Sequence, residues 1–286
     1  MHKIDGSEGR LLSHTDFMDP AVRGDHNPTR NQVNTRDRLL LLYHEVRGSS
    51  SEYSYVTDAA MFRRHASLFA ELQRGGDSLY PELTFDDGHT SNLGIAAPIL
   101  GAQELTARFF ITAGWTGTRP GFMGWSELRE LAAAGHSIGA HGWSHKLLTH
   151  CSDAELETEL KRARLTLEDG LGSPVKTMSL PGGRADARVL AACRLYGYTQ
   201  IFTSEPKPEK LPLGGVVGRF NVRGDMQPEW LAELLRPRSG VLRGLERQHR
   251  LKSLAQSLLG DTLYAKLWAL KNRKEVDAAD HWDGAE

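Results

Sequence analysis

The sequence contains few of the features that mark secreted, membrane-spanning or nucleic-acid-binding proteins. Its 286 residues include two cysteines, Cys151 and Cys193, too few for a disulfide framework or a four-thiolate zinc site. No apolar run approaches the ~20 residues that cross a bilayer, and the polar N-terminus lacks the apolar segment of a secretory signal. With 35 basic and 36 acidic residues, the net charge of −1 gives no basis for binding nucleic acid through bulk charge. These absences predict a cytoplasmic protein.

The hydrophobic pattern divides the chain into four parts. Residues 1–36 are polar and aperiodic, which predicts a disordered or loosely docked arm. Residues 37–240 alternate apolar runs with amphipathic stretches and form the predicted main domain. Residues 241–273 have the pattern of amphipathic helices that pack on this domain or contact a membrane or partner surface. Residues 274–286 form an acidic tail.

Short apolar runs alternate with helical periodicity through the main domain. The predicted strands cover residues 39–43, 82–85, 107–113, 136–140, 175–180, 198–203 and 216–222. Predicted helices cover residues 58–74, the stretch around Ile95 and Ile99, 126–134 with Ser126 as N-cap, 153–168, 187–196, 228–235 and 244–273. This order is typical of a parallel sheet with right-handed crossovers. It favours an α/β fold of the distorted seven-stranded (β/α) barrel type.

No strand is followed by G-x-G-x-x-G or G-x-x-x-x-G-K-[ST], so a Rossmann or P-loop nucleotide site is not expected. Four strands are instead followed by polar or glycine-rich residues. In chain order these are His44, then Asp86, Asp87 and Gly88, then His141 and His145, then Pro181, Gly182 and Gly183. Active sites in β/α barrels lie at the carboxyl ends of the strands, so we expect these groups to converge.

The aspartates and histidines in this set have the pattern of a metal site. Adjacent carboxylates persist most easily if a cation neutralises them or if one is protonated. The spacing of His141 and His145 places both imidazoles on one side of a helix or strand. One aspartate with two histidines suits Zn²⁺, with Co²⁺, Ni²⁺ or Fe²⁺ as alternatives, and leaves coordination positions open. The same set binds non-haem iron in oxygenases, but a second aspartate acting as general base favours hydrolysis.

Three motifs give the chain a resemblance to the polysaccharide deacetylases, the NodB-like carbohydrate esterases. They are TFDDG at Thr84–Gly88, HGWSH at His141–His145 and SLPGG at Ser179–Gly183. The resemblance implies a metal-dependent hydrolase that removes an N-acyl group, usually N-acetyl, from an amino sugar. It also implies residue roles: Asp86 as catalytic base, Asp87, His141 and His145 as metal ligands, and Pro181 and Gly182 as the turn whose Gly182 N–H helps to stabilise the oxyanion.

The sequence departs from the family pattern in three places. The third motif often opens with an arginine that holds the catalytic aspartate, but Ser179 stands there, with Arg184 as a candidate replacement. The aromatic residue common inside that turn is Gly182. The late L-x-H motif that supplies the general acid is missing. Some members resemble a circular permutation that begins with a Tyr-His strand end, so Tyr43-His44 predicts His44 as the acid.

The remaining candidates concern the substrate. His89, Trp143 and Arg184 are candidate substrate-lining residues. The resemblance implies an amino-sugar or glycan-precursor substrate, and the amphipathic C-terminal helices suit peripheral contact with the inner face of a membrane. Two alternatives stay open. One is a hydrolase of another C–N amide bond, of deformylase or allantoinase-like type, and the other is a non-catalytic carbohydrate-binding relative.

Overall fold

The computed structural model describes residues 36–49 and 51–259. The predicted acidic tail, and the predicted N-terminal arm apart from Arg36, lie outside these residues. Within the described ranges, no helix combines the length and apolarity that crossing a membrane would require.

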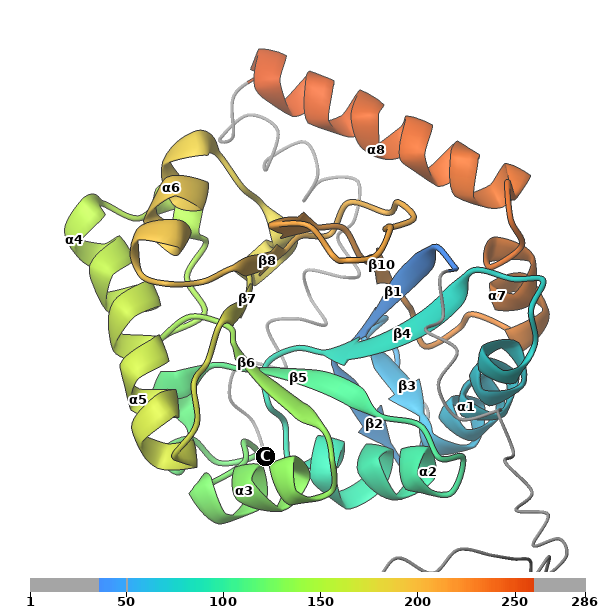
Figure 1. The fold of residues 1–286 in the computed structure, drawn as a ribbon, viewed down its shortest axis with the longest axis horizontal. Coiled ribbons are helices and arrows are strands. Elements are labelled where there is room, and N and C mark those ends of the chain that lie inside the picture. The colour runs from blue at the N-terminus through green and yellow to red at the C-terminus, as the bar shows by residue number, and fades with distance from the viewer. Residues whose placement is uncertain (1–35, 50, 260–286) are drawn as a thin grey trace, which may run out of the picture. The chain divides into compact units, whose positions relative to one another are not determined.

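A curled, all-parallel sheet forms the centre of the fold (Figure 1). Its strands are β1 (Arg38–Tyr43), β4 (Tyr80–Phe85), β5 (Ala107–Ile111), β6 (Ser137–Ala140), β7 (Thr177–Ser179), β8 (Gln200–Phe202), β9 (Val216–Val217) and β10 (Phe220–Asn221). Their order is β10-β1-β4-β5-β6-β7-β8-β9. The predicted barrel-type α/β fold is confirmed.

The sheet has eight strands rather than seven because the last predicted strand, 216–222, is split in two. β9 pairs with β8 at one edge of the sheet, and β10 pairs with β1 at the other. The chain between them, Gly218-Arg219, therefore joins the two edges covalently. Gly218 marks the break, since its N–H donates to Glu209 Oε1 at 2.6 Å and a Cβ would lie 2.3 Å from the Glu205 carbonyl oxygen. A glycine inside a strand is a common mark of such a bend.

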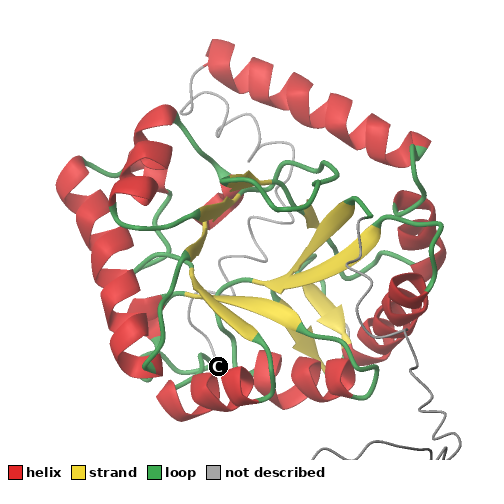
Figure 2. Cartoon of the chain, in the orientation of Figure 1, coloured by secondary structure: helices red, strands yellow, loops and turns green. Residues whose placement is uncertain are grey.

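Helices surround the sheet (Figure 2). The α-helices are α1 (Ala59–Arg74), α2 (Ala97–Gly101), α3 (Trp125–Ala133), α4 (Asp153–Leu156), α5 (Ala163–Leu171), α6 (Ala187–Leu195), α7 (Pro228–Leu234) and α8 (Gly240–Leu259). Asn92–Ala96 and Glu157–Arg162 are π-helical, and Ala113–Trp115, Leu148–His150 and Pro181–Gly183 are 3₁₀ turns. A second, two-stranded parallel sheet of β2 (Glu45–Arg47) and β3 (Val56–Asp58), absent from the sequence prediction, follows His44.

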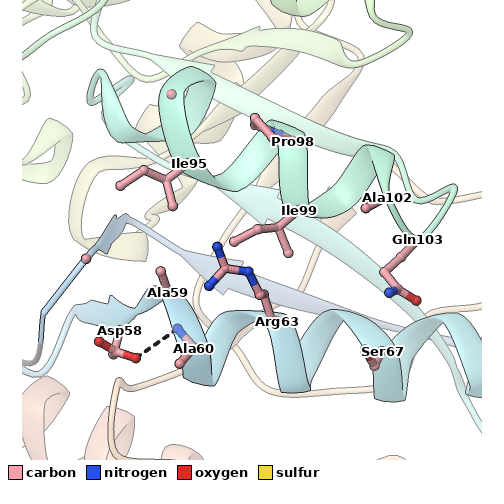
Figure 3. Close-up of a pocket in the computed structure, with 12 residues that line it drawn as sticks. Asp58, Ala59, Ala60, Arg63, Ser67, Ile95, Pro98, Ile99, Ala102 and Gln103 are labelled. Carbon is pink, nitrogen blue, oxygen red and sulfur yellow. Dashed lines mark hydrogen bonds between the residues drawn. The ribbon is translucent and has the colours of Figure 1, made fainter.

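Helix caps follow local chemistry, with one correction. Ser152 and Glu155 form a capping box at α4, and the Asp58 carboxylate accepts the Ala60 N–H at 2.8 Å to cap α1 (Figure 3). At α3 the predicted cap Ser126 is wrong. The helix begins at Trp125, and the N-cap is Gly124, two residues earlier, which donates its N–H to Glu127 Oε2 at 2.7 Å.

A groove of about 710 Å³ lies between α1 and α2 on the outside of the sheet. Figure 3 shows Arg63 of α1 directed toward Ile99 of α2 across it. None of the predicted catalytic or metal-binding residues lines this groove. On α8, Leu251 and Leu254 are 67% and 61% exposed, so the predicted membrane contact of this helix stays a prediction.

Two separate layers explain why the strands read as continuous apolar runs. Leu40, Phe110, Phe202 and Val217 form a cluster of their own inside the curled sheet. Alternate residues such as Leu39 and Leu41 belong to the larger core. Strands buried on both faces lose the polar alternation of half-exposed sheets.

His65 of α1 forms a hydrogen bond with Tyr43, the last residue of β1. The Met226 carbonyl, 2.8 Å from Nε2, can only accept, so Nε2 carries the proton and Nδ1 accepts from the Tyr43 hydroxyl at 3.1 Å. Burial lowers the pKa of His65 from 6.5 to about 4. The neutral ring therefore holds Tyr43, the residue that precedes His44.

We predict that His65 makes the fold sensitive to acid. The unfolded chain takes up a proton at pH about 6.5 and the native ring only near pH 4, so stability is lost as pH falls through this window, by up to about 3 kcal/mol. His65→Gln keeps a donor for Met226 and should flatten the pH dependence of the unfolding free energy between pH 7 and 4.5. Urea titrations test this, with the exposed His150→Gln as control; equal slopes in wild type and His65→Gln would contradict it.

Candidate active site

The candidate residues converge because the strands end in register. Tyr43 of β1 pairs with Phe85 of β4, and Ile111 of β5 pairs with Ala140 of β6. The residues that follow, His44, Asp86 and His141, therefore leave the sheet at the same edge. The sequence expectation of one shared site at the carboxyl ends agrees with this geometry.

Asp87 lies at the centre of the predicted metal site. Its Oδ1 is 3.3 Å from His141 Nε2 and 3.3 Å from His145 Nε2. The donor atoms of the three residues lie within 4.8 Å of one another. Asp87 and His141 are buried, whereas the His145 side chain is 34% exposed. Two of the three candidate ligands are thus shielded from solvent, and solvent reaches the candidate metal site at His145.

The protonation pattern shows that this set suits a cation. The Ser179 carbonyl, 2.9 Å from His141 Nδ1, can only accept, so Nδ1 carries a proton and Nε2 is directed toward Asp87. Asp87 Oδ1 is buried and has no hydrogen-bond partner among the described residues. The buried carboxylate therefore needs a positive charge beside it, which a proton on the His141 ring or a bound cation supplies. Separations of 3.3 Å also suit neighbouring ligands of an ion bound at about 2.0–2.1 Å.

The pKa shifts of Asp87 and His141 also indicate that positive charge is favoured in this set. Burial would raise the pKa of Asp87, but His141, His145 and His44 bring it well below its ordinary value. Burial would lower the pKa of His141, but Asp86 and Asp87 raise it above 6.5. His145 differs, because burial outweighs the nearby carboxylates and lowers its pKa.

Two of the three candidate ligands have left-handed backbone conformations. Asp87 has φ 74° and His145 has φ 63°, values that non-glycine residues seldom adopt. Such conformations cost roughly 1–3 kcal/mol each and persist where surrounding contacts enforce them. Surrounding contacts therefore hold the backbone of Asp87 and His145 in locally unfavourable conformations that direct both side chains toward the candidate metal site.

Asp86 points to a different partner, Arg219. The guanidinium binds the carboxylate through two hydrogen bonds, Nη1 to Oδ1 at 2.8 Å and Nη2 to Oδ2 at 2.9 Å. Ser179 Oγ accepts from Nη2 at 2.7 Å and donates to Asp86 Oδ2 at 2.9 Å. Arg219 is fully buried. Burial would raise the pKa of Asp86, but Arg219 and His141 bring it below its ordinary value, so Asp86 is an ionised carboxylate.

Arg219 is the functional residue that the sequence analysis missed. Arg184 is the candidate replacement for the missing arginine in the sequence, but the guanidinium that binds Asp86 belongs to Arg219, at the break between β9 and β10. Ser179 stands at the position where the third motif often has an arginine, and its hydroxyl adds a hydrogen bond to Asp86. A signal was present, since a charged residue stood inside an apolar run expected to be buried on both faces.

The His44 ring lies close enough to Asp87 and Asp86 for their charges to act on it. Its carbonyl accepts from Asn92 Nδ2 at 2.8 Å, and its ring packs on Tyr55 with a centroid distance of 4.9 Å. Its Nδ1 is buried without a hydrogen-bond partner in the described part of the chain. Burial lowers the pKa of His44, while Asp87 and Asp86 oppose that shift.

The third motif forms a tight 3₁₀ turn. Gly183 donates its N–H to the Leu180 carbonyl at 2.7 Å, and Gly182 has φ 67°. A Cβ on Gly182 would also lie 2.6 Å from Leu147 Cδ2. The left-handed conformation and the Leu147 side chain both favour glycine at position 182.

The three candidate substrate-lining residues have different surroundings. His89 accepts the Ser91 N–H at Nδ1, 3.1 Å away, and directs Nε2 to Glu45 Oε1 at 3.3 Å. Trp143 packs on the core beneath the Arg162 guanidinium, which is 3.8 Å from the ring centroid. Arg184 directly follows the Pro181–Gly183 turn and is partly exposed. Contact of these residues with a substrate stays a prediction.

Other aromatic rings border the site on two sides. Trp115 packs on His145 at 5.5 Å between ring centroids, and Phe122 packs on Trp115 at 4.6 Å. On the His44 side, Tyr53 packs on Tyr55 at 5.3 Å. All four rings are partly exposed. Aromatic faces at the rim of a polar site are suited to stacking on the apolar faces of sugar rings.

We predict that Arg219 is required to keep Asp86 ionised in the folded protein. Arg219→Met leaves a buried carboxylate without its partner, which costs about 3–5 kcal/mol. The double variant Asp86→Asn with Arg219→Met should recover part of this loss, because neither charge remains. Unfolding free energies of the single and double variants, measured in urea, give the coupling.

Arg108→Met is the matched control. Arg108 also lies against Phe202, at 5.1 Å from the ring, but its ion pair with Glu82 is longer, 3.6 Å, and its side chain is 18% exposed. It should cost clearly less than Arg219→Met. Equal losses, or a double variant that is simply additive, would show that the Asp86–Arg219 pair is not the source.

Comparison with known proteins is consistent with the geometry. A sequence profile of the polysaccharide deacetylase family matches residues 77–201, which include both aspartates and both histidines of the site. Chitin deacetylase 1 of Cryptococcus neoformans is 29% identical over 119 residues, covering 42% of this chain and 24% of the relative. Peptidoglycan-N-acetylglucosamine deacetylase PgdA of Listeria monocytogenes is 31% identical over 109 residues, covering 37% and 22%. The chain spans about half or less of the curated relatives it matches.

Solved structures share the fold at low identity. The deacetylase PplD of Streptococcus pyogenes, solved with acetate, has a TM-score of 0.64 and 19% identity, covering 70% of this chain and 99% of that one. IcaB from Ammonifex degensii has a TM-score of 0.59 and 20% identity, covering 74% and 97%. His44 and Arg219 lie outside the residues that the family profile matches. Residues 77–201 thus match the polysaccharide deacetylase family model, and the curled parallel sheet has the fold of solved deacetylases.

Proposed function

We propose that this protein is a metal-dependent hydrolase that removes an N-acyl group, foremost N-acetyl, from an amino sugar. The observation that carries the proposal is that two adjacent aspartates have different partners. The Nε2 atoms of His141 and His145 converge on Asp87, whereas Asp86 is held apart as an ionised carboxylate by Arg219. A cation site beside a separate general base is the arrangement that amide hydrolysis needs.

Asp87, His141 and His145 would hold the ion, with Zn²⁺ favoured by the nitrogen and oxygen donors. When bound, the ion supplies Lewis-acid polarisation of the acyl oxygen and makes water easier to deprotonate. Asp86 accepts the proton of the attacking water, because its carboxylate is ionised and oriented. The Gly182 N–H donates to the acyl oxygen as negative charge develops there.

His44 is the proposed general acid. As the bond between the acyl carbon and nitrogen breaks, the leaving amine must receive a proton, because an amide anion is a poor leaving group. The His44 ring lies close enough to Asp86, Asp87 and His141 for their charges to affect its pKa. The absence of a hydrogen-bond partner for Nδ1 among the described residues supports this role, because that nitrogen is not engaged in holding the fold there.

The names of the relatives and the aromatic border support a sugar as substrate. The relatives are named for deacetylation of chitin and of peptidoglycan N-acetylglucosamine. Trp115 and Phe122 on one side, and Tyr53 and Tyr55 on the other, provide rings for stacking next to the acyl-transfer centre. We propose amino sugars of glycans or glycan precursors as the substrate class, while the cytoplasmic location stays a prediction.

The test is a screen of the purified, metal-loaded protein. Acetate and formate release would be measured on N-acetylglucosamine, chitooligosaccharides of increasing length and N-formyl analogues. Acetate release that increases with chain length is the expected result. Release from non-sugar amides alone would favour a different amidohydrolase, and no release from any amide by protein with full metal content would overturn the proposal.

We predict that the two aspartates separate metal binding from catalysis. His141→Ala and Asp87→Asn should lose the ion, because two protein ligands hold a catalytic metal poorly. Asp86→Asn should keep the ion and lower kcat by about 10²–10⁴-fold, the usual contribution of a general base. Metal content per protein by elemental analysis, alongside kcat, checks both. A metal-free Asp86→Asn together with a metal-loaded Asp87→Asn would mean that the two roles are exchanged.

We predict that His44 acts on kcat rather than on binding. His44→Ala should retain the metal and a KM close to that of wild type, and lose most of kcat, because the leaving amine lacks its proton donor. Asn92→Ala is the control, since the Asn92 side chain donates to the His44 carbonyl and not to the His44 ring. A His44→Ala variant that turns over at the wild-type rate would make His44 structural.

A further inference from the structure

Glu159 is a buried carboxylate that the proposed chemistry does not use. It is 3% exposed and comes from the π-helical turn Glu157–Arg162 that connects α4 with α5. π-helical turns inside longer helices are frequent at functional sites. A buried carboxylate is retained only where enough donors replace water.

The donors that Glu159 receives all come from the segment between the two histidines of the candidate metal site. Oε2 accepts the N–H of Trp143 at 2.8 Å and that of Ser144 at 3.0 Å. Oε1 accepts the Ser144 hydroxyl at 2.5 Å. One carboxylate therefore satisfies every donor of the two residues that directly precede His145, apart from the Trp143 indole.

The same segment is fixed from its other side by β5 and the turn after it. Ala113 donates its N–H to the Gly142 carbonyl at 3.0 Å, and Gly114 donates to the Trp143 carbonyl at 2.8 Å. Gly142 has φ 81°, and a Cβ there would lie 2.9 Å from Glu159 Oε2. The loop is thus shaped around the carboxylate, with glycine where the carboxylate approaches most closely.

We propose that Glu159 is a positioning residue for the metal site, which sets His145 in its left-handed conformation by holding the two preceding residues. This inference rests on the proposed metal site. His145 is the exposed ligand, and its φ of 63° has to be enforced by contacts elsewhere. Without Glu159 two backbone N–H groups lose their partner, so the loop relaxes toward water and Nε2 moves off the point it shares with Asp87 and His141.

The experiment measures metal affinity in the absence of substrate. Metal-free wild type, Glu159→Ala, Glu159→Gln and Glu157→Ala are titrated with Zn²⁺ or Co²⁺ against a chromophoric chelator, and the Tm of each metal-free protein is recorded. Glu157 is the matched control, because it lies on the same π-helical turn but pairs with Lys161 at the surface, 2.6 Å away.

Glu159→Ala should weaken metal binding by about 10–100-fold, the usual effect of removing a group that orients a ligand. Glu159→Gln should stay within a few fold of wild type, because its amide oxygen can accept both N–H groups while its NH₂ donates to Ser144 Oγ. Glu157→Ala should match wild type. Bound Co²⁺ should also show an altered visible spectrum in Glu159→Ala, since one imidazole is displaced.

Unchanged affinity in Glu159→Ala with a lowered Tm would overturn the proposal and leave Glu159 a support of the fold alone. If Glu159→Ala does not fold, Glu159→Asp replaces it, because its shorter side chain cannot span both N–H groups and the hydroxyl; wild-type affinity there would equally overturn the proposal. Wild type that binds metal but releases no acetate overturns the proposed function and not this role, whereas wild type that binds neither ion overturns both.

Discussion

The ion pair between Asp86 and Arg219 is the interaction on which the rest of the site depends. Two buried charges are costly unless their hydrogen-bonding capacity is fully used. Arg219 has five N–H donors, and they reach Asp86 twice, Thr84 Oγ1, Ser179 Oγ and the Thr203 carbonyl. These contacts tie the break after β9 to β4, β7 and the end of β8. The pair orients the Asp86 carboxylate and also holds the two edges of the curled sheet toward each other.

The interior of the sheet is arranged in layers along the strands. Arg38, Glu82 and Arg108 form an ionic layer near the amino ends of the strands. The apolar cluster of Leu40, Phe110, Phe202 and Val217 lies between this layer and the site. Phe110 and Phe202 lie 5.3 and 5.9 Å from the Arg219 guanidinium, so the apolar layer also forms the floor of the catalytic layer. Stability and chemistry are thus placed at opposite ends of the strands, as in other β/α barrels.

Adjacent aspartates serve two different partners because the backbone turns between them. Asp86 continues the direction of β4 and meets Arg219, while Asp87 adopts φ 74° and faces the histidines. The left-handed turn at Asp87 therefore makes the two neighbouring side chains diverge. His145 uses the same backbone device on the opposite side of the candidate metal site.

Much of the candidate site could be predicted from the sequence because its signals are local. The apolar runs ending in His44, Asp86 and His141 place those residues at strand ends whatever the remote packing, and the Ser152–Glu155 capping box needs only its own four residues. The extra sheet of β2 and β3 could not be predicted, since strands of three residues carry too little periodicity to be recognised.

Only the tertiary structure decided how distant segments complete the site. Arg219 and Asp86 are 133 residues apart. Their pairing depends on the break between β9, which pairs with β8, and β10, which pairs with β1. Likewise, the role of Glu159 follows from where a π-helical turn places its carboxylate against the loop of Trp143 and Ser144. Sequence alone determined which groups stand at the ends of the strands, because that depends on neighbours along the chain. The pairing of buried charged residues, in contrast, was decided by the folded sheet, because electrostatic partners are the groups that lie close together in space.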